Sequence, residues 1–338
     1  MQTGLILACR GCGGGKVREI GVIPDAAAFA GTVLPSILPG GKLYRCSDCR
    51  LVFRHPILSK TEYDLLYQVG NSTTWDEDGR RDHLLVRAAL QNHFTGTSIL
   101  DVGCSTGKLL MPLAGKYSLF GTEINPGAAQ LAARRGINIV CHDLSELVAL
   151  SRNFDAVVSC DVIEHVANPF EFVRLLLAIT APGGLVIVST GNADAWSWRL
   201  SKGRFWYCCI PEHVSFVSPS WVTRNAKELG VEIVAVHKFT YSPDHSSLQK
   251  VFRLLLMALF TVSPTLYKWM RLGRRRNNLP VGRGITPDHF AVVLRKLQQA
   301  STSAVSSVND TIGINAPFAA IGETSATAAA RPGPTAPG

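Results

Sequence analysis

The chain has 338 residues, of which 46% are hydrophobic and 17% charged, and a formal net charge of +9. This composition excludes a wholly disordered or fibrous chain and predicts a globular protein with one large domain or two ordinary ones. The first eight residues lack the basic and apolar pattern of a secretory signal. We therefore expect a cytoplasmic protein whose nine cysteines stay reduced.

The first 58 residues contain two cysteine pairs, Cys9 with Cys12 and Cys46 with Cys49. Two residues between cysteines allow both thiolates of one turn to reach the same ion. Two such turns supply the four sulfur ligands that tetrahedral Zn²⁺ prefers. We predict a zinc-ribbon module over residues 1–58, in which a structural Zn²⁺ has no open coordination position.

Residues 59–97 are predicted to lead from this module to the next domain. Ser59 to Tyr67 has the pattern of a short helix, and Asp82 to Phe94 has the pattern of a longer one. Between them, Gly70 to Gly79 is polar and rich in turn residues, which is typical of a linker or a lid. The predicted apolar face of the second helix consists of Leu84, Leu85, Ala88 and Ala89.

Strand and helix patterns alternate over the next hundred residues. Strands are predicted at Ile99–Val102, Tyr117–Glu123, Ile137–His142, Phe154–Cys160 and Leu185–Thr190. Helices are predicted to begin near Lys108, at Asn125-Pro126 and at Asn168-Pro169, because proline suits the first position of a helix. This alternation predicts an α/β fold with a parallel, doubly wound sheet of the Rossmann-like kind.

The loop after the first strand, Gly103–Gly107, is predicted to hold a ligand, because its glycines allow the backbone to approach closely. Acids end four successive strands at the same edge of the sheet, and an acid in the position of the second one can accept both hydroxyls of a ribose. These acids are Asp101, Glu123, Asp143 and Asp161. Since buried unpaired carboxylates are costly, we expect a cationic or donor-rich ligand among them.

Two nucleotide-like cofactors compete for this loop. A nicotinamide dinucleotide requires the pattern GxGxxG, whereas this chain has Ser105 between Gly103 and Gly107, and Asp101 two residues before the first glycine. The dinucleotide's phosphates would be repelled by Asp101. A sulfonium with an amino-acid tail would not, so the residues favour S-adenosylmethionine.

Four motifs follow one another in the chain: Asp101-Val-Gly-Cys-Ser-Thr-Gly107, Gly121-Thr-Glu-Ile124, Cys160-Asp-Val-Ile-Glu-His-Val-Ala-Asn-Pro169 and Ala181-Pro-Gly-Gly184. Together they resemble class I S-adenosylmethionine-dependent methyltransferases, above all the ubiquinone-methyltransferase-like branch, over roughly residues 80–296. The resemblance implies a seven-stranded methyltransferase domain over residues 98–299, in which Asp288–Lys296 forms the last, antiparallel strand. Ser105 stands where the family usually has glycine, and Pro112 lies within the expected first helix.

The resemblance also implies a role for each cofactor residue. Asp101 and Gly103 flank the methionine part and Glu123 holds the ribose. Ile124 packs on the adenine, Asp143 and Leu144 lie near its amino edge, and Asp161 and Val162 line the floor. The full implied set is Asp101, Gly103, Cys104, Ser105, Gly107, Glu123, Ile124, Asp143, Leu144, Asp161 and Val162.

Glu212 and His213 are the candidate catalytic residues. A histidine beside an acid, in a loop near the cofactor crevice, can take a proton from the methyl acceptor, although it can equally be structural. The segment Ile210–Phe216 also resembles the P-x-H-x-x-x-F segment of these class I methyltransferases, with a spacing one residue tighter. Zinc-module sugar C-methyltransferases have a Glu-His pair in a similar setting that is implicated in deprotonation, but Ile210 replaces their tyrosine. Glu164-His165 either takes part in the chemistry or caps the next helix. The aromatic stretch Trp196–Tyr207 is either a substrate wall or ordinary packing.

An apolar and basic insertion is predicted at about residues 248–284, and a disordered tail at 300–338. The apolar part, Val251–Val262, is too short to span a membrane, and five basic residues follow between Lys268 and Arg276. Residues 251–276 therefore form either a helix in an anionic membrane interface at the inner face, or a lid or dimer face.

The predicted activity is methyl transfer to a small molecule, a sugar or a lipid-linked glycan of envelope or secondary metabolism. Between Lys250 and Ala300 there are ten basic residues and one acid, so nucleic-acid methylation is an alternative. A non-catalytic scaffold that retains the fold is another. The acceptor, the methylated atom and the oligomeric state are not determined by the sequence.

Overall fold

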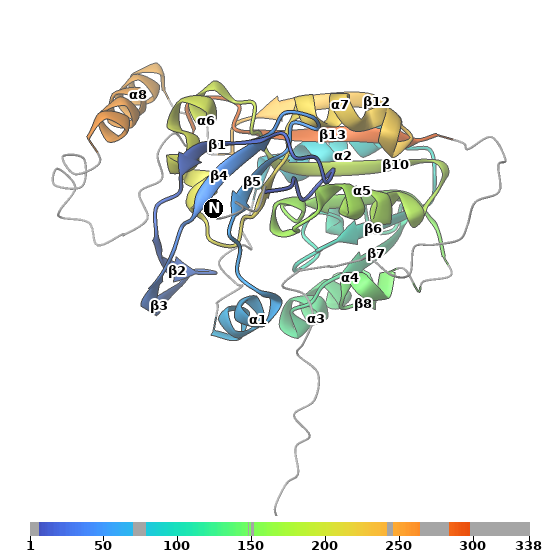
Figure 1. Cartoon of the computed structure of the whole chain (residues 1–338). Coiled ribbons are helices and arrows are strands. Elements are labelled where there is room, and N and C mark those ends of the chain that lie inside the picture. Colours follow the sequence, from blue (N-terminus) through green and yellow to red (C-terminus); the bar gives the residue numbers. More distant parts are fainter. Residues whose placement is uncertain are drawn as a thin grey trace, which may run out of the picture.

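The structure is a computed structural model that describes residues 7–69, 79–147, 149, 152–241, 246–263 and 284–297. Two sheets dominate it (Figure 1). The smaller one has the order β1-β4-β5-β11. Its strands are β1 (Val17–Val22), β4 (Lys42–Cys46), β5 (Val52–His55) and β11 (Ser215–Phe216), and a separate hairpin consists of β2 (Ala26–Phe29) and β3 (Thr32–Leu38).

The larger sheet has seven strands in the order β12-β13-β10-β9-β6-β7-β8. They are β6 (Ser98–Val102), β7 (Ser118–Thr122), β8 (Asn138–Cys141), β9 (Phe154–Cys160), β10 (Thr180–Gly191), β12 (Val231–Phe239) and β13 (His289–Lys296). Neighbouring strands are parallel except at β13, which is antiparallel to both β10 and β12. The prediction of a doubly wound α/β sheet of seven strands is confirmed.

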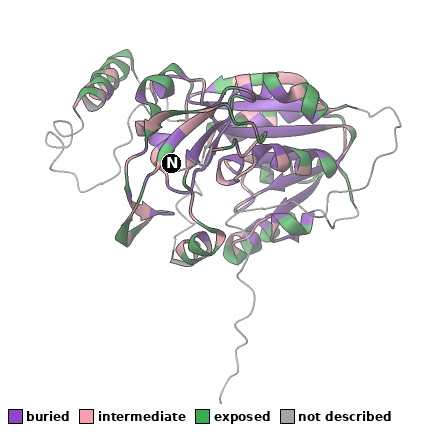
Figure 2. Cartoon of the chain, viewed as in Figure 1, coloured by how far each residue is buried: buried purple, intermediate pink, exposed green. Residues whose placement is uncertain are grey.

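Helices cover both faces of this sheet, whose strands consist mostly of buried residues (Figure 2). Buried side chains of the sheet and the helices form one hydrophobic cluster on each face. One face packs against α2 (Arg81–His93), α3 (Pro126–Arg134) and the 3₁₀ turn η2 (Met111–Leu113). The other packs against α4 (Leu144–Leu147), α5 (Pro169–Ala178), α7 (Pro219–Leu229) and the cysteine turns. Shorter elements are α1 (Lys60–Val69), η3 (Ile163–His165), α6 (Trp196–Ser201), η4 (Lys202–Arg204) and η5 (Trp206–Cys209).

Helix starts agree with their predicted caps. The Asn125 side chain accepts a hydrogen bond from the backbone of Ala128, and the Ser218 side chain accepts one from Trp221. Asn168 caps α5 in the same way. Proline follows each of these caps, where its missing N–H costs no intrahelical bond.

Three local predictions are wrong. No regular helix begins near Lys108; turns lead into the short η2, because Pro112 lacks the N–H that an α-helix needs there. The segment Ala181–Gly184 lies inside β10, where the pairing register shifts, and is not a separate turn before it. The buried apolar side chains of α2 are Val86, Ala89 and Leu90, whereas Leu84 is exposed.

The apolar insertion forms α8 (Ser247–Val262), which lies apart from the larger sheet (Figure 1). Among the described residues, no helix is long and apolar enough to cross a membrane. The predicted basic run Lys268–Arg276, most of the linker Gly70–Gly79 and the tail at 300–338 lie outside the described residues.

Candidate functional site

A pocket opens at the carboxyl end of β6, beside the loop that the sequence predicts as a cofactor site. Asp101, Gly103, Cys104 and Ser105 line it, together with Arg80. The backbone at this place is unusual, because Gly103 has φ = +79° and Ser105 has φ = +48°. Ser105 therefore adopts the left-handed conformation that glycine adopts most easily, which explains why a glycine is usual at its position.

The two predicted glycines serve different purposes. A Cβ on Gly103 would lie 2.7 Å from Cγ2 of Val162, so a side chain here would force the loop away from the β9 end of the sheet. A Cβ on Gly107 would press on Ile137 and Ala132 instead, so Gly107 allows close packing of the loop on α3. Of the two, only Gly103 lines the pocket.

Glu123 ties the end of β7 to the glycine loop. Its carboxylate accepts hydrogen bonds of 2.8 Å from the backbone N–H groups of Ser105 and Asn125. Burial raises the pKa of Glu123. Each carboxylate oxygen has a second lone pair, so Glu123 can hold the loop and still accept a hydrogen bond from a ligand.

The predicted adenine residues lie one strand further along the sheet. The Asp143 carboxylate accepts hydrogen bonds from the backbone and hydroxyl of Ser145 at the start of α4. Leu144 is buried and Ile124 is half-buried. None of the three lines the pocket beside the glycine loop.

Arg80 is the site residue that sequence reasoning missed. Its guanidinium donates to Asp82 and, over 2.7 Å, to Asp161, which has φ = +53°. Burial raises the pKa of Asp161 to about 7 and that of Asp101 to about 8, and the nearby Arg80 opposes both shifts. Arg80 thus places a positive charge among the acids of the predicted cofactor site. No local pattern marks Arg80, since Asp161 is 81 residues away.

A second polar cluster lies beyond the end of β9. The ligating atoms of Glu164, His165 and His213 all lie within 4.8 Å of one another. Glu164 is buried and accepts hydrogen bonds from the hydroxyls of Thr190 and Tyr207. The structure therefore joins two motifs that are about 50 residues apart in the sequence.

His213 is held as a neutral imidazole. Its Nδ1 lies 3.0 Å from the backbone oxygen of Tyr207, and because a carbonyl only accepts, Nδ1 carries the proton and Nε2 keeps its lone pair. The His213 ring packs edge-on against His165 at 4.8 Å. Burial holds the pKa of His213 well below its ordinary value. Glu212 points elsewhere and accepts a hydrogen bond from the backbone of Ala30.

Comparison with known proteins agrees with this geometry. Residues 77–236 match a family described as "Methyltransferase domain". A ubiquinone biosynthesis O-methyltransferase of Arabidopsis thaliana is 31% identical over 165 residues, 44% of this chain and 51% of that protein. Another, of Caulobacter sp. strain K31, is 31% identical over 53% of this chain and 66% of that protein. The chain contains a class I S-adenosylmethionine-dependent methyltransferase domain.

The chain thus spans between about half and two thirds of the length of these two relatives. Among solved structures, a protein of Thermotoga maritima described as an S-adenosylmethionine-dependent methyltransferase is 17% identical. The match covers 64% of this chain and 89% of that one, with a TM-score of 0.42.

The aromatic stretch after β10 packs mainly in a buried cluster that also includes Ile23, Leu43 and Val52 of the N-terminal module. Trp198, Phe205, Trp206 and Tyr207 are buried in one cluster, and the rings of Trp198 and Phe205 stack at 4.8 Å. Trp196 is the exception, with half of its surface exposed. Tyr207 has a second role, because its hydroxyl bonds to Glu164 and its backbone oxygen to His213.

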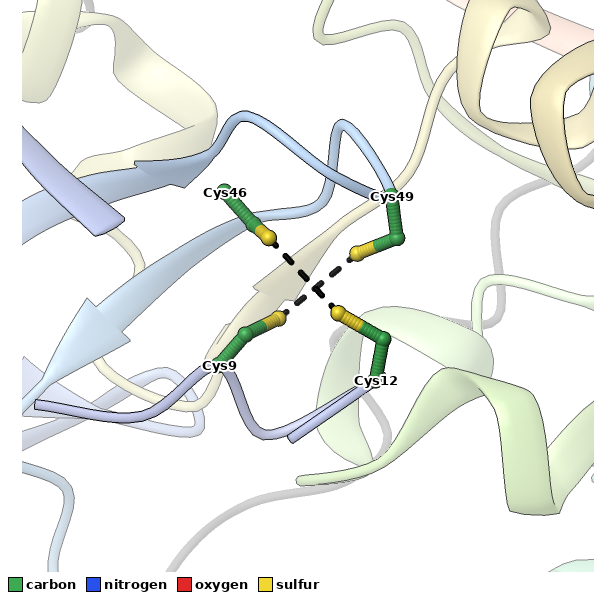
Figure 3. Close-up of side chains that lie close together, drawn as sticks. All are labelled: Cys9, Cys12, Cys46 and Cys49. Carbon is green, nitrogen blue, oxygen red and sulfur yellow. Dashed lines mark hydrogen bonds between the residues drawn. The ribbon is translucent and has the colours of Figure 1, made fainter. Parts of the chain in front are cut away.

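The four cysteines in front of the methyltransferase domain converge on one point (Figure 3). The Sγ atoms of Cys9 and Cys49 are 3.6 Å apart, and those of Cys12 and Cys46 are 3.7 Å apart. Four sulfurs at about 2.3 Å from a tetrahedral Zn²⁺ are about 3.8 Å from one another. The donor set and its spacing fit a structural zinc ion.

Proposed function

We propose that this protein transfers a methyl group from S-adenosylmethionine to a small-molecule acceptor. The observation that carries this proposal is the pocket at the end of β6, where Asp101, Gly103 and Ser105 meet beside the carboxylate of Glu123. The family match over residues 77–236 supports it.

The residues present fit this cofactor. Asp101 and Gly103 would hold its cationic methionine part, and Glu123 its ribose. Ile124, Asp143 and Leu144 would surround the adenine, and Val162 would close the floor. One oxygen of Asp161 is buried without a hydrogen-bond partner, which leaves an acceptor for a bound donor. When bound, S-adenosylmethionine supplies a methyl group on a positively charged sulfur.

The chain's own contribution is alignment and proton removal. Nε2 of His213 accepts the proton of an acceptor hydroxyl. The backbone oxygen of Tyr207 binds Nδ1 of His213 and the Tyr207 hydroxyl binds Glu164, so these two contacts orient the histidine ring. The names of the two curated relatives, both O-methyltransferases of ubiquinone biosynthesis, support an oxygen as the methylated atom. A sugar or a lipid-linked glycan of envelope or secondary metabolism would present hydroxyls of the same kind.

We propose a peripheral membrane contact through α8, at the inner face of an anionic membrane. Leu248, Phe252 and Leu255 expose between 60% and 80% of their surface and recur at helical spacing. Lys250 and Arg253 lie on the same helix, and the sequence adds five basic residues between Lys268 and Arg276. Apolar side chains flanked by cations are what an interfacial helix needs.

Labelled S-adenosylmethionine tests the main proposal, with a metabolite extract as the source of acceptors and mass spectrometry to identify the product. We expect label in a small molecule, and binding of the cofactor by calorimetry that is lost in Glu123→Ala. Label in RNA, with salt-sensitive binding, would instead support nucleic-acid methylation. A wild-type protein that binds no S-adenosylmethionine would be a scaffold.

A further inference from the structure

The N-terminal module that carries the four cysteines, predicted at residues 1–58 and called the cysteine module below, shares one β-sheet with the loop that carries His213. Strand β11 pairs antiparallel with β5, with Ser215 opposite Phe53 and Phe216 opposite Val52. The backbone N–H of Arg54 donates over 2.9 Å to the oxygen of Val214, the residue after His213. Strand β11, which begins two residues after the candidate base, is therefore the fourth strand of the module's sheet.

The side chain of Arg54 reaches back along the same loop. Nη1 donates to the oxygen of Pro211 at 3.2 Å, and Nη2 donates to the oxygens of Cys208 and, at 3.0 Å, Ile210. Arg54 is only 5% exposed and has no carboxylate within ion-pair distance among the described residues. A buried guanidinium is costly unless its donors are satisfied. The Nε of Arg54 is buried without a partner, so the bonds of Nη1 and Nη2 to these three carbonyls are the ones that hold the group.

The three carbonyls lie in the loop directly before the candidate base. They come from residues 208–211, between Tyr207, whose oxygen binds the His213 ring, and His213 itself. The following residue, Val214, donates its N–H to the backbone oxygen of Glu164 over 2.8 Å. A single planar side chain thus fixes the curvature of the loop that sets the distance between Tyr207 and His213.

We propose that Arg54 is a positioning residue, through which the cysteine module holds His213 in its neutral, Nδ1-protonated form for methyl transfer. The proposal rests on the proposed function. It gives the module a task in the reaction itself, because an arginine on β5, five residues after Cys49 and next to the strand that ends at Cys46, orients the group that takes the acceptor's proton.

Arg45 provides a matched control. It lies on β4 of the same sheet and also reaches the methyltransferase domain, where its Nη2 is 3.5 Å from Asp194. Among the described residues, the Arg45 side chain makes no ion pair with residues 208–214; its ion-pair partner is Asp194. Arg45→Met therefore removes a bond between the same two parts of the chain without touching the loop of His213.

The test compares Arg54→Met, Arg54→Lys and Arg45→Met with wild type. For Arg54→Met we expect kcat to fall about 100-fold, as misplacement of a base by an ångström does, and the Kd for S-adenosylmethionine to change less than about twofold. Loosening the loop exposes His213 to water, so its pKa rises toward about 6.5 and the acid limb of the pH–kcat profile moves to higher pH. Arg45→Met should leave kcat and this profile unchanged.

Nitrogen-15 NMR of the histidine rings gives a readout that does not depend on turnover. Wild type should show a single Nδ1–H tautomer for His213, and Arg54→Met a mixture of both. Arg54→Lys keeps the buried charge but not the planar fork, so it gives the same comparison should the methionine variant not fold. An unchanged tautomer and pH profile in both Arg54 variants, or an equal loss in Arg45→Met, would overturn the proposal. Absent methyl transfer in wild type would refute the function alone.

Discussion

The proposed cofactor side and the proposed acceptor side, around His213, are built in different ways. On the cofactor side, Asp101, Gly103, Ser105 and Glu123 come from one strand–loop–strand stretch, and backbone N–H groups hold them. On the acceptor side, His213 depends on Tyr207, Glu164 and Arg54, which come from three separate segments. The cofactor site is thus encoded locally, whereas the acceptor site exists only in the assembled fold.

The two sides also differ in charge. On the cofactor side, burial raises the pKa of Asp101 to about 8 and that of Asp161 to about 7, although the Arg80 guanidinium lowers both. On the acceptor side, burial keeps His213 unprotonated. The first side is ready to gain a negative charge when a cation binds, and the second is ready to receive a proton. A change to a residue of one side should therefore affect the function of that side and leave the other side unchanged.

The largest effect is expected for Cys46→Ser, which should abolish turnover. Loss of one ligand from a four-sulfur site releases the ion, and β4 and β5 lose the anchor that positions Arg54. The zinc content, measured by plasma mass spectrometry, should fall from about one ion per chain, while S-adenosylmethionine still binds. Cys141→Ser, which changes a cysteine outside the cluster, should keep its zinc. A zinc-free wild-type protein would contradict this prediction.

His213→Ala should lower kcat by about 10²–10⁴-fold, the usual contribution of a general base. Its effect on the Kd for S-adenosylmethionine should be small, because the ring lies among Glu164, His165 and Tyr207, away from the glycine loop. Steady-state kinetics and calorimetry on the same preparation check both values. Equal losses in turnover and cofactor affinity would show that the histidine only supports the fold.

The affinity for S-adenosylmethionine should rise with pH up to about 8. In the free protein burial raises the pKa of Asp101 to about 8, so the carboxyl is protonated at neutral pH. A bound cation favours the carboxylate and releases the proton, hence affinity falls about tenfold for each pH unit below that value. Calorimetry in buffers of different ionisation enthalpy measures the released proton. In Asp101→Asn the pH dependence between about pH 7 and 8 should disappear, because Asp161, the other raised carboxyl, has a pKa of about 7. An unchanged dependence in that range would point to another group.

The smallest effect on catalysis is expected from deleting residues 251–276, since α8 contacts neither side of the crevice among the described residues. Turnover of a water-soluble acceptor should stay within about twofold, because this segment supplies none of the groups that move the proton. Co-sedimentation with anionic liposomes should be lost, because the apolar and basic groups that carry it are removed. Liposome binding that survives the deletion would assign the contact to another surface.

This contrast explains what the sequence could predict. Strand positions and helix caps follow from local patterns, and the structure has them close to the predicted residues. The acids at residues 101, 123, 143 and 161 follow from the same patterns, and their role in binding stays a prediction. The partners of Glu212 and Asp161 could not be predicted, because Ala30 and Arg80 lie 182 and 81 residues away. The helix near Lys108 failed because one proline outweighed a favourable pattern.

The pairing of β5 with β11 has a consequence for biosynthesis. The cysteine turns can capture an ion once about fifty residues have left the ribosome, yet the edge of their sheet at β5 has no partner until Phe216 is made. Unpaired strand edges invite pairing with other chains. During the interval between the two events this edge is open to other chains, and it is closed by the same short strand that places the loop of His213.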